Sequence, residues 1–258
     1  MWVRAFSAVL CSLTIPAASA TAALANGPGG VLAVEPAPAK TPSPSTTTSG
    51  PHAPVTAKTP NDTYKGPVYE KTTTGTIVPY QTPPQTVAAS VATGGATAAS
   101  TDTTTSVAGP EVKPELLVPG TAARYVDGLA AAPESAPAAV QDIIWAGNEL
   151  IGLPYIYGGG HGSFISPGYD CSGTVSYALH GASLLTAPAD SSEFMAWGSA
   201  GLGRWVTIFT DPEHAYVTVA GLRLDTSSAD DPTNEQGPRW RPLRQSNAGY
   251  TARHPVGL

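Results

Sequence analysis

The sequence predicts an α+β fold for the C-terminal half of the chain, preceded by a long segment that does not build a core of its own. Aromatic residues provide the first observation: all five Trp and all four Phe lie in residues 1–6 or after residue 140. The second is a change of period, because helical spacing dominates residues 135–185 and strict alternation begins after Gly203. Helices followed by antiparallel strands are typical of the α+β class.

The composition limits the size of the folded part and the kinds of partner that the protein can have. The chain has 258 residues, of which 26 are Pro, 27 are Gly and only 12% are charged. About a hundred residues between Asn26 and Pro133 contain only four aromatic side chains, too few to offset the entropy of ordering them. A single globule of 258 residues is therefore excluded. The net charge of -6, with no run of basic residues, also argues against nucleic-acid binding and against attraction to an anionic membrane.

The N-terminus has the pattern of a secretory signal peptide. A positive start ending at Arg4 precedes the apolar run Ala5–Leu10, and small residues then offer cleavage after Ala20 or Ala25. The alternative, a membrane anchor, is less favoured because the apolar run is short and interrupted by Ser, Thr and Pro. Residues 1–25 are therefore predicted to direct export to the cell wall or beyond, and no membrane association is expected after cleavage.

Export changes the cysteine count. Cleavage removes Cys11 and leaves Cys171 as the only cysteine of the mature chain. A lone cysteine in an exported protein has no internal disulfide partner. It is an intermolecular link, an inert buried thiol or a reactive nucleophile. The residues around Cys171 indicate which of these three roles it has.

Residues 26–120 are rich in Pro, Thr, Ala and Ser, which favours an extended, solvated linker. The alternation in Thr76–Tyr80 leaves open a short strand or a partner-binding segment, although the linker is the favoured interpretation. The folded domain is predicted over 121–258.

Within this domain the first helix is expected over Ser135–Ile151, with Pro137 in its first turn and Gly152 at its end. A glycine-rich loop, Tyr155–Tyr169, leads to a second helix. The remaining predicted elements are helices over Cys171–Leu185 and Asp190–Trp197, and strands over Trp205–Thr210, His214–Val219, Leu222–Thr226, Trp240–Leu243 and Tyr250–His254.

Cys171 opens the second helix, where its surroundings suit a nucleophile. Unpaired backbone N–H groups and the positive end of the helix dipole favour a thiolate and can stabilise an oxyanion. Such a thiol needs a base, and the base needs an acceptor that orients it. His214 begins one predicted strand and Asp225 ends the next, so the short turn between the strands places them almost opposite each other.

Several of these motifs together resemble the NlpC/P60 family. They are the runs Gly152-Leu-Pro-Tyr-Ile-Tyr-Gly-Gly159 and Tyr169-Asp-Cys-Ser-Gly173, the strand that starts at His214, and the polar residue that ends the following strand. The resemblance covers residues 121–258. It implies a papain-like domain, with N-terminal helices packed on an antiparallel sheet, that cuts stem peptides of peptidoglycan.

The same resemblance assigns roles residue by residue. It makes Cys171 the nucleophile, His214 the base and Asp225 the third catalytic residue. Tyr155, Asp170 and Ser172 would contact the substrate. Two features depart from the family pattern. The third catalytic position is more often His, and the usual His-Val-Gly-Ile-Tyr is here His214-Ala-Tyr-Val-Thr, which affects specificity more than activity.

The sequence gives weaker indications of a functional role for several other residues. His161 lies in the loop and is a candidate substrate contact, and the neighbouring glycines are expected to let the backbone approach the substrate. A zinc site made of His161, Cys171, His214 and Asp225 has suitable residue types but lacks the usual paired spacing. One of the late arginines is a candidate for binding a substrate carboxylate; they are Arg239, Arg241, Arg244 and Arg253.

The sequence therefore predicts a secreted, monomeric cysteine peptidase that needs no cofactor or metal. The resemblance implies that the γ-D-glutamyl–diamino acid bond is cut. Two alternatives remain open: an amidase that acts on a different acyl substrate, and a non-catalytic wall-binding or structural module that retains the fold.

Overall fold

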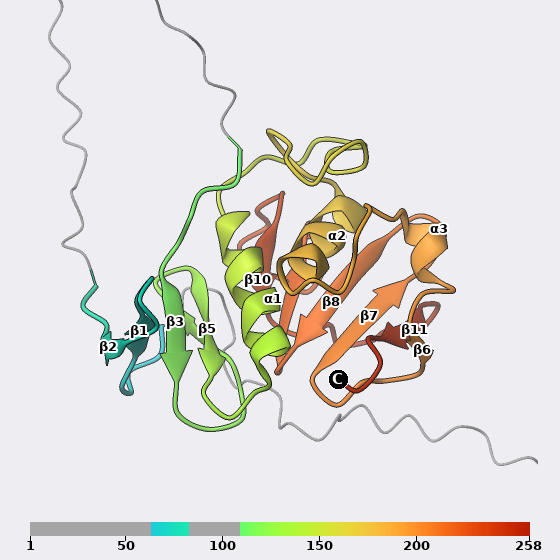
Figure 1. Cartoon of the computed structure of the whole chain (residues 1–258). Helices are drawn as coiled ribbons and strands as arrows, with labels where there is room; N and C mark the ends of the chain where they lie inside the picture. The colour runs from blue at the N-terminus through green and yellow to red at the C-terminus, as the bar shows by residue number, and fades with distance from the viewer. Residues whose placement is uncertain (1–62, 83–108) are drawn as a thin grey trace, which may run out of the picture. The chain divides into compact units, whose positions relative to one another are not determined.

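The computed structural model describes residues 63–82 and 109–258, which form a mixed α/β structure (Figure 1). The predicted signal peptide, residues 1–25, lies outside the described residues, as does most of the predicted linker. No helix within the described part of the chain is both long and apolar enough to cross a membrane.

The larger sheet has six strands in the order β10-β9-β8-β7-β11-β6, and every pair in it is antiparallel. It contains all five strands that the sequence predicts. The core face of its three central strands carries Val, Ile and Leu, and most side chains on the opposite face of these strands are buried as well. The strands are β6 (Ser199–Ala200), β7 (Val206–Thr210), β8 (Ala215–Val219), β9 (Leu222–Asp225), β10 (Arg239–Arg241) and β11 (Thr251–His254).

The described helices are α1 (Ala138–Glu149), α2 (Cys171–Gly181) and α3 (Ser191–Phe194). Helix α2 ends four residues before the predicted Leu185, because Ser183 adopts a left-handed backbone with φ of 58° that ends the helix. Helix α3 is one short turn, which Asp190 begins as the N-cap of a capping box.

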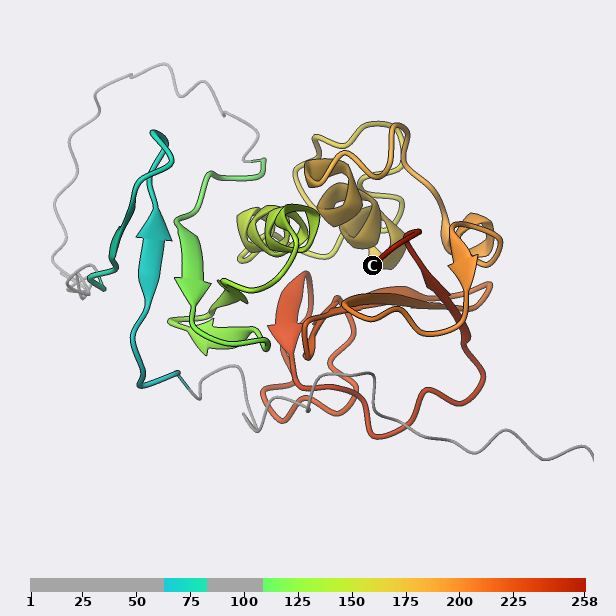
Figure 2. The same cartoon turned by 60° about the horizontal axis from the view of Figure 1, so that its bottom comes forward.

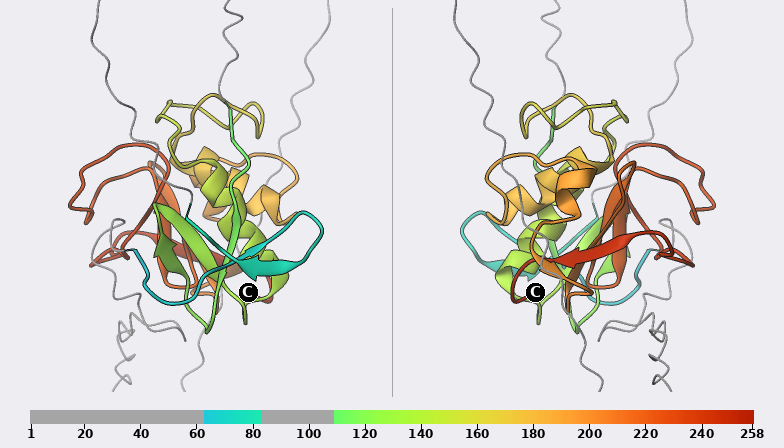
Figure 3. Two further views of the ribbon diagram at one scale, coloured as in Figure 1. Left: turned by 90° about the vertical axis from the view of Figure 1, so that its left-hand side faces the viewer. Right: turned by 90° about the vertical axis from the view of Figure 1, so that its right-hand side faces the viewer.

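A second, five-stranded sheet has the order β2-β1-β3-β5-β4. Its strands are β1 (Tyr69–Lys71), β2 (Ile77–Pro79), β3 (Glu115–Val118), β4 (Arg124–Val126) and β5 (Leu129–Pro133). Three of these lie inside residues 26–120, so the predicted linker is wrong for 63–82 and 109–120. The alternative of a short strand near Thr76–Tyr80 is the correct one. β1 pairs antiparallel with β3, and β2 pairs with β1; Figure 3 shows this edge of the small sheet on the side of the molecule away from β11.

The tyrosines explain why this aromatic-poor segment folds. Tyr64 and Tyr80 pack on the outer face of β3, against the buried Leu116 and Val118. Tyr69 packs on the main core, which Leu117 enters from the opposite face of the same strand. The few aromatic side chains of the segment are therefore concentrated where the strands pair, and average composition does not reveal this.

Helix α1 joins the two sheets, because it contacts β5 of the small sheet and β8 and β10 of the large one (Figure 2). Gly147 permits this approach: a Cβ atom there would lie 2.7 Å from the Trp240 ring. The buried Asn148 then forms hydrogen bonds to a strand of each sheet. It exchanges two hydrogen bonds with the backbone of Ala130, at 2.8 and 2.9 Å, and accepts a third from Trp240 Nε1 at 2.8 Å.

Replacing Asn148 with Ala should destabilise the domain, because three buried polar groups lose their partner. We expect the free energy of unfolding to fall by about 2–4 kcal/mol, measured by chemical denaturation. Glu134→Ala, at an exposed position before α1, is the control and should cost under about 0.5 kcal/mol. A similar loss for the two variants would contradict the bridging role of Asn148.

Candidate active site

A cavity of about 500 Å³ opens at the N-terminal end of α2, beside the glycine-rich loop. Cys171, the first residue of the helix, lines it and is 9% exposed. Four further residues that the sequence singles out also line this cavity: Tyr155, His161, Asp170 and Ser172. Five further lining residues were not predicted as part of the site: Asp190, Ser191, Ser192, Pro212 and Glu213.

Asp170 fixes the start of α2 and hence the position of the thiol. Its backbone is extended, and its carboxylate accepts a hydrogen bond from the Gly173 N–H at 2.8 Å, as an N-cap does. The same carboxylate accepts the Gly158 N–H at 3.0 Å, which ties the glycine-rich loop to the helix.

The glycines of this loop have a different role from the one expected. A Cβ atom on Gly173 would lie 2.0 Å from the carbonyl oxygen of Gly159, and a Cβ atom on Gly160 (φ of 87°) would lie 2.9 Å from the Cα atom of Gly173. Gly159 and Gly160 therefore let the loop pack on the first turn of α2. Only Gly158 of this run lines the cavity.

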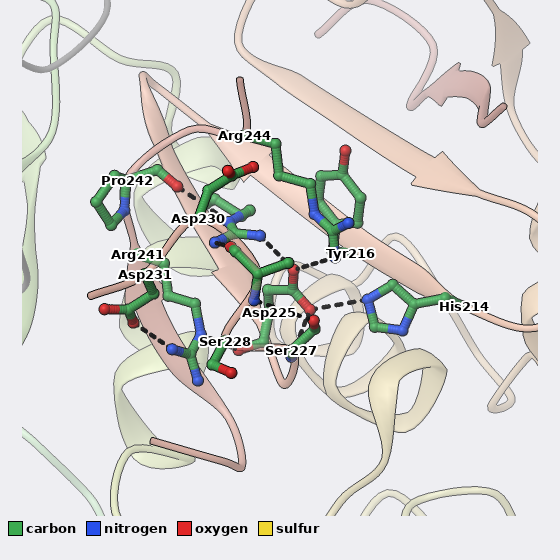
Figure 4. Close-up of polar contacts among 12 residues, drawn as sticks. His214, Tyr216, Asp225, Ser227, Ser228, Asp230, Asp231, Arg241, Pro242 and Arg244 are labelled. Atoms are coloured by element: carbon green, nitrogen blue, oxygen red, sulfur yellow. Dashed lines mark hydrogen bonds and ion pairs between the residues drawn. The ribbon is translucent and has the colours of Figure 1, made fainter. Parts of the chain in front are cut away.

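His214 and Asp225 lie together at one end of the large sheet (Figure 4). The β8–β9 register pairs Val217 with Leu224, which places Asp225 beside Tyr216 and makes His214 its diagonal neighbour on the same face. His214 Nε2 and Asp225 Oδ1 are 2.9 Å apart. His214 is thus two residues from the position directly opposite Asp225, and the two side chains are in contact.

A tight turn orients His214 for this contact. Asp211 Oδ1 accepts hydrogen bonds from the N–H groups of Glu213 and His214, both at 2.8 Å. The Asp211 N–H donates back to the His214 carbonyl at 2.9 Å. This turn at Asp211–Glu213 fixes the backbone that carries the imidazole.

The Asp225 carboxylate is almost completely buried and accepts four hydrogen bonds. Oδ1 accepts from His214 and from the Ser227 N–H at 2.9 Å, and Oδ2 accepts from Arg223 and Arg244 at 2.8 and 3.1 Å. Burial alone would raise the pKa of Asp225. The hydrogen bond and charge of His214, together with the charge of Arg223, lower it below its usual range and keep the carboxylate ionised.

His214 interacts with Cys171 as well as with Asp225. Burial would lower the pKa of His214, but hydrogen bonds to Asp225 and to Cys171 outweigh it and raise the pKa to about 9. Because Asp225 occupies Nε2, Nδ1 is the ring nitrogen left for the thiol. The structure thus brings Cys171, His214 and Asp225 together in that order.

A second histidine lines the same cavity as the nucleophile. His161 Nε2 is 3.1 and 3.0 Å from the two carboxylate oxygens of Asp170 and 2.9 Å from Ser172 Oγ. Tyr155 lies nearby, half-exposed, and burial followed by the charges of Cys171 and Asp170 raises its pKa.

The late arginines bond to the protein itself, although Arg244 also lines a separate cavity of about 120 Å³. Arg244 holds Asp225 and stacks over Tyr216, with its guanidinium 4.6 Å from the ring centroid. Arg241 is buried and pairs with Asp231. Arg253 donates to backbone carbonyls of residues 196–198.

Arg223 was missed altogether, although an Arg two residues before a functional Asp on one strand shares its face. Across 63–82 and 109–258, no group of three or more His, Cys, Asp or Glu is placed to hold a metal ion.

Comparison with known proteins gives a partial likeness. A solved structure of an NlpC/P60 family protein from Bacillus cereus ATCC 10987 is 26% identical to this chain, with a TM-score of 0.34. The similarity covers 46% of this chain and only 40% of that one. No family model matches the sequence, and no curated protein matches it. The geometry of the site itself therefore decides what chemistry it supports.

The raised pKa of His214 predicts how stability changes with pH. Its ordinary value is 6.5 and its value in the folded protein is about 9, so the full stabilisation is present below about pH 6.5. The free energy of unfolding should then fall as pH rises through 9, by at most roughly 3 kcal/mol. Denaturation at several pH values measures this. His214→Gln should flatten the dependence in this window, whereas an unchanged slope in that variant would contradict the assignment.

Removing one guanidinium from Asp225 should be costly. Arg223→Met leaves the buried carboxylate with one cation fewer, and we expect a loss of about 3–5 kcal/mol in chemical denaturation. The matched control is Arg239→Met, which breaks a partly exposed pair with Glu235 and should cost at most about 1 kcal/mol. Equal losses would show that Arg223 does not support Asp225.

Proposed function

We propose that the protein is a thiol hydrolase in which Cys171 attacks an amide carbonyl. The observation that supports this most directly is the sequence of contacts Cys171–His214–Asp225, in which the thiol lies at a helix N-terminus and lines a cavity. A nucleophile, a base within reach and an oriented third group are the parts that covalent acyl transfer needs.

In the proposed reaction Cys171 reacts as the thiolate, with its proton held by His214; the sulfur forms a bond with the carbonyl carbon as the C=O π bond opens, and the oxyanion binds N–H groups that the first turn of α2 leaves free of intrahelical bonds. His214 carries a proton at neutral pH, since its pKa is about 9, and gives that proton to the leaving amine as the C–N bond breaks. It then takes a proton from the water that hydrolyses the thioester. Asp225 keeps the imidazole oriented throughout.

We further propose that the substrate is a stem peptide of peptidoglycan, cut between γ-D-glutamate and the diamino acid. The motifs that resemble the NlpC/P60 family support this, because their residues Tyr155, Asp170, Cys171 and Ser172 all line the cavity. In this proposal the domain is papain-like and monomeric, and the leader at 1–25 exports it to the cell wall. A non-catalytic module is less favoured, since both the thiol and its base are present and the thiol is close enough to raise the pKa of His214.

Cys171→Ala should abolish the reaction. Purified protein and variant are incubated with cell-wall sacculi, and released fragments are identified by mass spectrometry. We expect wild type to release fragments, with a drop of at least about 10³-fold in the variant.

His254→Ala is the control for handling and folding, because His254 is on β11, outside the cavity, and should leave release unchanged. Identical fragment profiles for wild type and Cys171→Ala would overturn the hydrolase and favour the non-catalytic module. Cys-dependent release at another bond would instead identify an amidase of different specificity.

A further inference from the structure

The large sheet has a second cavity, of about 120 Å³, on the face that points away from the main core. Thr207 and Phe209 of β7 and Thr218 of β8 line it. Along β7 they alternate with Val206 and Ile208, which enter the main core. This cavity shares no lining residue with the active-site cavity, so a molecule bound in it does not occupy the place of the substrate.

The charge of this second cavity is positive. Arg204 and Arg244 line it, and the described residues around it include no Asp or Glu. Arg204 is exposed, and its guanidinium lies 5.9 Å from the centroid of the Trp205 ring. Among residues 63–82 and 109–258 that guanidinium has no hydrogen bond or ion pair. One of the two cations is therefore available to an anion from outside the protein.

The charge of Arg244 is only partly balanced. Its acidic partner within the described ranges is Asp225, and the same carboxylate also pairs with Arg223 and with His214 (Figure 4). Since His214 is protonated at neutral pH, one negative charge faces three positive ones. Arg244 Nε is in addition buried without an acceptor. A further anion beside Arg244 would therefore be stabilised.

The rest of the cavity wall combines one polar donor with apolar side chains. Asn247 Oδ1 accepts the Tyr216 hydroxyl at 2.5 Å, which leaves the Asn247 NH₂ group without a partner in the part of the chain that the structure describes. The large apolar side chains of the wall are Leu202, Trp205, Phe209 and Leu243. A ligand that matches both parts of the wall has an anionic head and an apolar body.

The volume limits the size of that body. A cavity of about 150 Å³ holds one benzene molecule, so about 120 Å³ has room for roughly six non-hydrogen atoms. Guanidinium groups bind carboxylate and phosphate alike. The apolar wall favours the carboxylate, because a phosphate dianion has no apolar part to place there and loses more hydration.

We propose that this cavity binds a small aliphatic carboxylate, whose charge interacts with Arg204 and Arg244 and whose oxygens accept from the Asn247 amide. The bound carboxylate shares the Arg244 guanidinium with Asp225, so it lies one residue away from the pair that contains His214. Binding at this cavity does not depend on the proposed hydrolase function.

Titration of the isotope-labelled full chain by NMR tests the proposal, with isobutyrate as the probe. Isobutyramide has the same shape without the charge, and N-acetyl-alanyl-alanine carries its carboxylate at the end of a peptide. The amide resonances followed are those of Gly203, Thr218 and Gly221, at the wall of the cavity. Each ligand is also titrated into Arg204→Met and Asn247→Asp.

Arg124→Met is the matched control variant. The Arg124 guanidinium lies 5.7 Å from the centroid of the Tyr64 ring, a contact like that of Arg204, but Arg124 is outside the cavity. Arg244 is left unchanged in every variant, because it also holds Asp225.

We expect isobutyrate to shift these resonances with a Kd of about 1 mM, and isobutyramide to bind at least about tenfold more weakly. Arg204→Met should weaken isobutyrate binding by about three- to tenfold. Asn247→Asp should weaken it at least about tenfold, because the new carboxylate still accepts the Tyr216 hydroxyl but repels the ligand. Arg124→Met should leave the Kd unchanged.

Equal affinity for the acid and the amide would overturn the proposal, as would a Kd that stays the same in both cavity variants. Tighter binding of N-acetyl-alanyl-alanine than of isobutyrate would overturn the free acid as ligand and assign the cavity to a peptide C-terminus. None of these outcomes depends on turnover, so loss of the hydrolase proposal would leave the result for this cavity intact.

Discussion

The buried carboxylate of Asp225 is the constraint on which the site depends. It joins segments that are distant in sequence, because its donors come from the start of β8, from β9, from the turn at Ser227 and from Arg244 beyond β10. A buried charge is tolerated only when its partners are in place. The position of His214, and through it the contact with Cys171, therefore follows from how these segments meet.

A second carboxylate fixes the other half of the site by different means. Asp170 is held by backbone N–H groups and an imidazole, whereas Asp225 is held by two guanidinium groups. Hydrogen bonds from uncharged N–H groups thus fix the start of the helix that carries the thiol. Ion pairs with guanidinium groups fix the carboxylate that orients the imidazole. The nucleophile thus lies between two fixed elements, and little reorganisation is needed for the groups to act together.

The elements of the structure that depend on residue spacing within a short segment could be predicted from the sequence. Helical spacing located α1, and the short turn at Ala220–Gly221 was enough to bring His214 near Asp225. The parts that depend on distant pairing could not. Nothing near residue 70 indicates that β1 will pair with β3, some 45 residues later, so a low aromatic content suggested a linker.

The glycine-rich loop shows the same limit on a smaller scale. Its composition predicts close approach of a backbone, but composition does not identify the partner. The approach is to Gly173 of the protein's own helix. Arg223 escaped notice for a related reason, because its role exists only once Asp225 is buried beside it.

The pairing of β3 with β5 has a consequence for any shortened form of the protein. The motifs begin at Gly152, and a chain cut at residue 121 retains all of them while losing β3. One edge of β5 would then present unpaired N–H and C=O groups that β3 satisfies in the full chain. Open strand edges recruit other strands. Such a fragment should therefore self-associate through β5, even though every residue of its site is present.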